Sequence, residues 1–234
     1  MSIADNITAI RERIGAATRR AGRDADDIAL MAVCKTFPAQ AIVEAYTSGQ
    51  RLFGENRVQE FAGKYAAVAG LSDARFHMIG HLQSNKTAKA AEIFHAVDSV
   101  DSAKLAQRLN DAAQTVGKTL EVLIEINVGG EAAKSGLAPE SPEIEAILGQ
   151  AQQWTNLRIR GLMTVPPYTE DPEGARPYFR KLRELRDRLA AREFPGVAFD
   201  TLSMGMSHDF EVAIEEGSTC VRIGTAIFGE RQHL

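Results

Sequence analysis

Residues 28–38 have the sequence IALMAVCKTFP, and this stretch decides the fold. Its apolar run has the length of a buried strand, which Thr36-Phe37-Pro38 then ends. Residues 39–45 (AQAIVEA) begin a helical pattern. A buried strand followed by a helix is the unit from which parallel α/β sheets are built. Lys35 then stands at the carboxyl end of a first parallel strand, where α/β enzymes hold their ligands.

Lys35 has two interpretations. Partial burial at a strand end lowers the pKa of a lysine, and a neutral amine attacks an aldehyde to form a Schiff base. The simpler interpretation is a salt bridge at the strand end. Lys35 on its own favours the salt bridge, so the choice depends on the rest of the chain. Cys34 should point away from Lys35 if the strand is regular.

The same unit recurs along the chain. A first helix is predicted over about residues 2–22, and short apolar runs then alternate with helical stretches. The predicted strands are Ile28–Val33, Arg51–Phe53, Phe76–Ile79, Ile93–Val97, Leu120–Ile126, Leu157–Met163, Phe199–Leu202 and Cys220–Ile223. This order predicts an α/β protein with a (β/α)8 TIM barrel and an additional N-terminal helix. An open doubly wound sheet is the alternative.

The domain is expected to be single, over residues 1–234, with no β domain appended after the last strand. Two longer helices are predicted over Asp101–Val116 and Pro172–Arg192. The second has Tyr178, Leu182, Leu185 and Leu189 on one face, and its run of charges is interpreted as a solvated face.

Composition excludes several classes of function. The 234 residues carry a formal net charge of −4, which argues against nucleic-acid binding. The two cysteines define no disulfide framework. The N-terminus lacks the features of a signal peptide, and no apolar run approaches the roughly 18 residues of a membrane span. We therefore expect a cytoplasmic protein without membrane partners.

The segments around the seventh and eighth strands place hydroxyl groups and glycines where each strand ends. Their sequences are LSMGMSHDF (202–210) and VRIGTA (221–226). In such barrels the loops after these strands often hold phosphate through backbone N–H groups near a helix N-terminus. Alternatively, Ser207 only caps a helix running to Glu216, which uses the same N–H groups and is compatible with an anion site. The predicted anion site comprises Ser203, Gly205, Ser207, Arg222, Gly224 and Thr225.

Other polar residues near strand ends have competing interpretations. Asn56, with Gln59 three residues on, fits a helix cap at least as well as a position at the barrel mouth. His77 and His81 are four residues apart, but a strand and a glycine turn span them, and the acid of a metalloprotease motif is missing. We therefore predict no metal site there. The polar residues of the rim are expected to be His81, Lys86 and Lys134.

Six ordered segments carry a resemblance to a known family. They are AVCKT (32–36), FGENRVQE (53–60), IGHLQSNK (79–86), GLM (161–163), LSMGMS (202–207) and STCVRIGTAIFG (218–229). Together they resemble the YggS/PROSC family, the pyridoxal phosphate homeostasis proteins, over about residues 32–231. Four residues depart from those usual in the family: Cys34, Arg57, His208 and Cys220.

The resemblance implies a barrel of PLP fold type III, like the N-terminal domain of alanine racemase, with pyridoxal 5′-phosphate (PLP) at its mouth. It implies that Lys35 forms the Schiff base, that Asn56 lies near the cofactor ring and that Arg222 faces the pyridine nitrogen. No residue is assigned a catalytic or metal-binding role. The remaining cofactor-binding residues that it implies are Ser203, Met204, Gly224 and Thr225.

An arginine at the ring nitrogen predicts weak catalysis. PLP stabilises a carbanion best when a carboxylate partner keeps this nitrogen protonated, and an arginine cannot accept that proton. The expected lack of an appended domain leaves Lys35 as the only obvious base. We therefore predict a monomeric PLP carrier and regulator that is not an enzyme and passes PLP to apo-enzymes. The alternatives are a minimal fold-type III amino-acid racemase and a barrel that takes a sugar phosphate.

Overall fold

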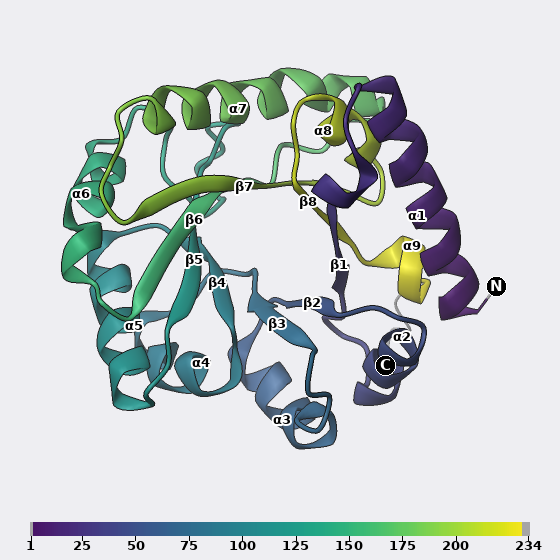
Figure 1. The fold of residues 1–234 in the computed structure, drawn as a ribbon, viewed down its shortest axis with the longest axis horizontal. Coiled ribbons are helices and arrows are strands. Elements are labelled where there is room, and N and C mark those ends of the chain that lie inside the picture. The colour runs from purple at the N-terminus through teal and green to yellow at the C-terminus, as the bar shows by residue number, and fades with distance from the viewer. Residues whose placement is uncertain (1, 231–234) are drawn as a thin grey trace.

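The predicted strands close into a barrel (Figure 1). In the computed structural model, which describes residues 2–230, each strand pairs in parallel with the next and β8 pairs with β1. The (β/α)8 barrel is therefore confirmed, and the open sheet is excluded. The strands are β1 (Ala29–Val33), β2 (Leu52–Glu55), β3 (Arg75–Met78), β4 (Ala96–Val100), β5 (Leu120–Glu125), β6 (Leu157–Met163), β7 (Val197–Met206) and β8 (Cys220–Ile223).

Helices surround the barrel, as Figure 1 shows. The predicted N-terminal helix is α1, and Ser2 begins it with a capping box to Asp5. α1 packs beside α8 and α9, the helices that follow the last two strands. The α-helices are α1 (Ile3–Arg20), α2 (Ala39–Thr47), α3 (Val58–Val68), α4 (Thr87–Ile93), α5 (Ala103–Thr115), α6 (Pro142–Gln150), α7 (Arg176–Ala190), α8 (Phe210–Glu215) and α9 (Thr225–Phe228).

The fourth strand is displaced from its predicted position. Ile93 ends α4, and β4 begins only at Ala96 and runs on to Val100. The prediction stopped too early because Asp98 and Ser99 interrupt the apolar pattern although both are buried. Both side chains have polar partners: the Asp98 carboxylate pairs with His77, and the Ser99 hydroxyl donates to the carbonyl of Gly80.

The long helix predicted over Pro172–Arg192 is divided in two. A 3-10 turn (Pro172–Ala175) precedes α7, and Phe179 rather than Tyr178 joins the buried face. That face packs into one continuous core between the sheet and the helices. No helix among residues 2–230 is both long and apolar enough to span a membrane.

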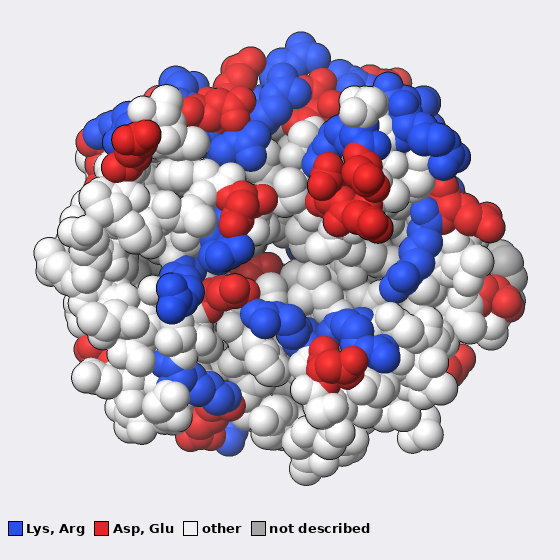
Figure 2. All heavy atoms as spheres, viewed as in Figure 1, with Lys and Arg blue, Asp and Glu red and all other residues white. Residues whose placement is uncertain are grey.

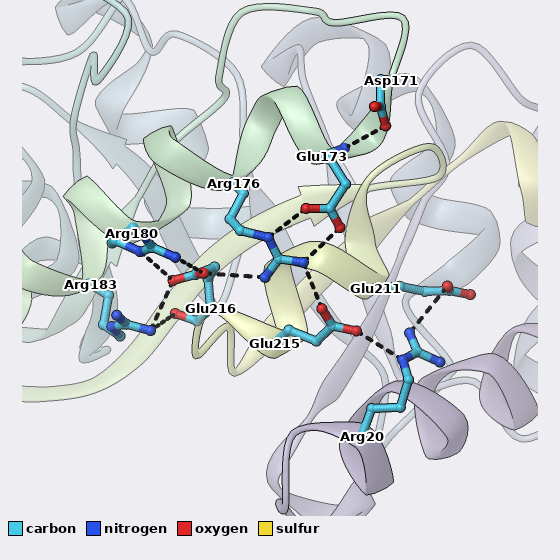
Figure 3. Close-up of polar contacts among 9 residues, drawn as sticks. All are labelled: Arg20, Asp171, Glu173, Arg176, Arg180, Arg183, Glu211, Glu215 and Glu216. Atoms are coloured by element: carbon cyan, nitrogen blue, oxygen red, sulfur yellow. Dashed lines mark hydrogen bonds and ion pairs between the residues drawn. The ribbon is translucent and has the colours of Figure 1, made fainter.

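A cluster of ion pairs ties α8 to α7 and α1 (Figure 3). Glu216, just after α8, is nearly buried and pairs with three guanidinium groups at 2.9–3.2 Å, those of Arg176, Arg180 and Arg183. Burial opposes ionisation of Glu216, but hydrogen bonds from Arg180 and Arg176 outweigh it and lower its pKa. The charges of α7 are therefore more than a solvated face, because three of its arginines hold a buried carboxylate.

Replacing Glu216 by Gln removes this shared charge with little change of shape. We expect the free energy of unfolding at pH 7 to fall by roughly 2 kcal/mol, because charged hydrogen bonds are lost. A lowered pKa adds stability above the ordinary carboxyl value of 4.5, and that stability is lost as the pH falls through the lowered value. The difference from wild type should therefore shrink as the pH is lowered below 4.5, as measured by urea denaturation.

The matched control is Glu184→Gln, at an exposed acid of α7, the helix that carries the three arginines; it should change neither the stability at pH 7 nor its pH dependence. A difference between Glu216→Gln and wild type that stays constant with pH would contradict the role given to the Glu216 charge.

Candidate functional site

A cavity of about 530 Å³ lies where the strands end, at the carboxyl end of the barrel. Its volume is within the range of small-molecule sites. Of the residues assigned from the sequence, it brings together Lys35, Asn56, Arg222, Gly224 and Thr225. Of the three expected rim residues, His81 and Lys134 line it.

A second cavity, of about 240 Å³, lies at the opposite end, where the strands begin. His77 faces this second cavity and His81 the first, so the two histidines do not form one site. Nor do residues 2–230 contain any group of three or more His, Cys, Asp or Glu side chains able to hold a metal. Figure 2 shows a hollow over the centre of the barrel, with acidic and basic side chains interspersed around it.

Lys35 is half-buried in the first cavity, two residues beyond β1. Its neighbour Cys34 points the other way, into the core, as predicted. The Cys34 thiol lies 3.3 Å from a carboxylate oxygen of Glu55. Burial raises the pKa of this thiol well above its usual value, so Cys34 is not a second nucleophile.

Asn56 lines the cavity with an unsatisfied amide. Its side-chain oxygen is buried and has no hydrogen-bond partner among the described residues. The capping interpretation is wrong, because Arg57 is the N-cap of α3 and no side chain caps that end. Gly80 presses against Asn56: a Cβ on Gly80 would lie 2.4 Å from the Asn56 carbonyl oxygen. Because buried polar atoms are rarely left unpaired, the Asn56 amide is suited to meet a ligand.

Arg222 brings a positive charge to the wall of the cavity from the barrel interior. Its guanidinium donates to the Ser203 hydroxyl at 2.7 Å and to the Thr164 carbonyl at 2.6 Å. Burial lowers the pKa of Arg222, but a guanidinium stays charged in proteins. Within residues 2–230 it forms no ion pair, so its charge is available to a ligand.

The end of β7 and the loop after it differ from their sequence assignment. Ser203 is buried behind Arg222, and Met204 belongs to the hydrophobic core, so neither lines the cavity. The assignment of these two residues to cofactor contact is therefore not supported by their positions. Because side chains alternate along a strand, Met204 cannot share the inward direction of Ser203. The residues here that reach the cavity are Met206, at the end of β7, and Ser207 and His208 in the loop after it.

The residue that shapes this loop is Asp209. Asp209, not Ser207, is the N-cap of α8, which corrects the capping prediction, and its carboxylate accepts from the Met206 N–H at 2.6 Å. Gly205 has a φ of +96°, and a Cβ there would lie 2.6 Å from that of Ala213. Its role is close packing against α8, rather than contact with a ligand.

Gly224 and Thr225 line the cavity after β8. A Cβ on Gly224 would lie 3.3 Å from the Val33 carbonyl oxygen, so a side chain there would crowd the end of β1. The Phe37 and Phe228 rings pack 5.1 Å apart and hold the loop of Lys35 beside α9. Helices α8 and α9 span only six and four residues, so an anion at this position would depend on N–H and hydroxyl groups more than on helix dipoles.

Glu125 lines the cavity and was missed from the sequence. It is the last residue of β5 and is nearly buried, and its Oε2 has no partner among the described residues. Ser135 donates to the other oxygen at 2.9 Å. Burial raises the pKa of Glu125, although this hydrogen bond acts against it. Its place at the carboxyl end of a predicted strand was the available signal.

Comparisons with known proteins agree on one family. The model of the alanine racemase N-terminal domain matches residues 6–232. A pyridoxal phosphate homeostasis protein of Aquifex aeolicus is 47% identical over the full length of both chains. Another, from Pseudomonas aeruginosa, is 47% identical over 99% of this chain and 97% of its own. PipY of Synechococcus elongatus, solved with PLP bound, has a TM-score of 0.84 and 36% identity, covering 97% of this chain and all of its own.

Replacing Glu125 by Gln should stabilise the protein at neutral pH. A raised carboxyl pKa means that the folded state resists ionisation, so stability falls as the pH rises above the ordinary value of 4.5. Glutamine carries no charge, and we expect a gain of roughly 1 kcal/mol at pH 7 that vanishes below about pH 4. Thermal unfolding across this pH range measures this gain in stability.

The control is Glu140→Gln, at an exposed acid. If the Glu125 variant gains no stability at neutral pH, the raised pKa assigned to the Glu125 carboxyl is contradicted.

Proposed function

Because the chain belongs to the pyridoxal phosphate homeostasis proteins, built on the barrel of the alanine racemase N-terminal domain, we propose that it binds PLP at the mouth of its barrel. The observation that carries the proposal is the convergence of Lys35, Arg222 and the unpaired amide oxygen of Asn56 on one cavity. These groups offer an amine, a fixed positive charge and a polar contact to one small molecule.

The cavity residues fit the chemical groups of PLP. Lys35 would meet the aldehyde, and the unpaired Asn56 oxygen can accept a hydrogen bond from a polar group on the ring. The loops at Ser207 and at Gly224-Thr225 supply N–H and hydroxyl donors for the phosphate. Arg222 still has N–H donors to direct at the ring nitrogen after its bonds to Ser203 and Thr164.

The covalent link proposed for Lys35 is a Schiff base. The Lys35 Nζ, once deprotonated, would form a C=N bond with the aldehyde carbon, and the aldehyde oxygen would leave as water. The reverse reaction takes up water and releases the aldehyde intact. A reversible bond of this kind suits a protein that holds a reactive aldehyde and passes it on.

The position of Arg222 favours holding PLP over catalysis. A bound PLP acts as an electron sink when its ring nitrogen is protonated. Arg222 donates hydrogen bonds and accepts none, so it cannot support that protonation. We therefore propose a carrier and regulator of PLP that delivers it to apo-enzymes, with no turnover of its own required.

Borohydride reduction of PLP-saturated protein, followed by peptide mass analysis, tests the Schiff base. We expect a pyridoxyl mass on the Lys35 peptide. Lys35→Ala should lose this mass and bind PLP about 10–100-fold more weakly, since phosphate contacts at Ser207 and Gly224 remain. Lys134→Ala, at another lysine of the cavity, is the matched control and should keep the adduct on Lys35. An unmodified Lys35 in saturated wild-type protein would overturn the proposal.

Glu125 gives specific support to a second candidate, a minimal amino-acid racemase. A carboxyl group whose pKa is raised by burial, in the same cavity as Lys35, is the kind of group that transfers protons. The two candidates differ in one measurement. If the carrier proposal holds, PLP-loaded protein racemises no common amino acid at a steady rate. Steady racemisation that Glu125→Gln abolishes would favour the second candidate.

A further inference from the structure

The peptide groups on both sides of Lys35 form hydrogen bonds with charged side chains that lie outside the cavity. The Lys64 ammonium donates to the Cys34 carbonyl at 3.2 Å. On the other side, the Thr36 N–H donates to a carboxylate oxygen of Glu60 at 2.6 Å. Lys35 lies between these two bonds, so its backbone is restrained both before and after its Cα.

The backbone at Thr36 needs such a restraint. Its φ is +67°, in the left-handed region that a β-branched residue rarely adopts. A conformation of this kind persists only when its surroundings hold it in place. The bond to Glu60 supplies a charge-assisted acceptor for the N–H of this strained residue. Without that bond, Thr36 is expected to relax and to turn the Lys35 side chain away from its present direction.

The charged groups form one connected network, which we call the Lys64 clamp (Glu55, Glu60 and Lys64). Lys64 pairs with Glu60 at 2.8 Å, four residues earlier on α3, and with the fully buried Glu55 at 2.9 Å. Burial opposes the charge on Lys64, but these two acids outweigh it and raise the pKa of Lys64. Lys64 therefore stays charged and restrains both the acids and the Cys34 carbonyl.

We propose that Glu60 and Lys64, supported by Glu55, are positioning residues that aim Lys35 at the aldehyde of PLP. This rests on the proposed Schiff base at Lys35. None of the three clamp residues lines the cavity. The clamp acts through the backbone: it fixes the peptide planes that set the direction of the Lys35 Cα–Cβ bond. Two acids of the FGENRVQE segment, Glu55 and Glu60, thereby have a structural role in the clamp.

The test combines Glu60→Ala with Thr36→Gly. Glu60→Ala should lower the equilibrium constant for Schiff-base formation about tenfold, the size expected for one charge-assisted hydrogen bond. Thr36→Gly removes the cost of the left-handed backbone, because glycine adopts positive φ freely. The double variant should therefore recover most of the loss. Glu60→Gln, which keeps an acceptor without the charge, should lie between wild type and Glu60→Ala.

The readouts are the borohydride-trapped fraction of Lys35 and the hydrogen exchange of the Thr36 amide in PLP-free protein. Glu60→Ala should speed that exchange at Thr36. Glu92→Ala removes an exposed acid paired with Lys89 on α4 and serves as the control for loss of a surface ion pair. The melting temperature of each variant separates a local effect from general destabilisation.

Two results would overturn the clamp. One is an equal trapped fraction in wild type and Glu60→Ala. The other is a double variant in which Thr36→Gly restores nothing. Failure of the proposed function looks different: wild-type Lys35 is then not trapped at all, while exchange at Thr36 still reports whether Glu60 restrains the backbone.

Discussion

The parallel closure of the sheet is the constraint on which the site depends. Ala32 in β1 is in register with Phe53 of β2 on one side and with Ile223 of β8 on the other. Residues nearly 200 positions apart thereby end at the same rim. Lys35, Asn56 and Gly224 share a cavity because each follows a strand whose neighbour ends beside it. A parallel barrel collects strand ends in this way whatever residues occupy them.

The charged groups buried in the barrel determine which ligands the cavity at its carboxyl end can bind. Arg222 is held by hydroxyl and carbonyl groups inside the barrel, and no carboxylate of the described residues forms an ion pair with it. Glu125 is buried with one oxygen unpaired. Such groups are costly to bury without partners, so they are informative about ligands. A guanidinium in the same cavity as Lys35 supports the proposal that the protein holds an aldehyde cofactor, because it cannot take the place of the carboxylate that stabilisation of a carbanion requires.

Much of this was accessible from the sequence, and the exceptions have identifiable causes. The order of strands was predictable because parallel barrel strands are buried on both faces and are nearly continuous in apolar residues. β4 was misplaced because Asp98 finds a partner in His77, on a neighbouring strand, which no local pattern reveals. Glu125 was missed although it stands near the carboxyl end of a predicted strand, because the sequence does not show whether its side chain points into the barrel or away from it. Met204 was assigned to the site because the family resemblance covers the whole segment 202–207. Side chains alternate in direction along a strand, so not every residue of that segment can face the cavity, and Met204 packs in the core.

The sequence by itself determined the barrel, the family and the lysine at the end of the first strand, because these depend on periodicity and on the order of residues along the chain. Tertiary structure alone decided which polar groups face the cavity and which lie outside it and hydrogen-bond to the cavity residues or to their backbone. Ser203 became a support for Arg222, and Glu60 and Lys64 became supports for the backbone around Lys35. The physical reason is that hydrogen bonds and ion pairs depend on distances of about 3 Å between groups far apart in the chain, and only the packed fold sets those distances.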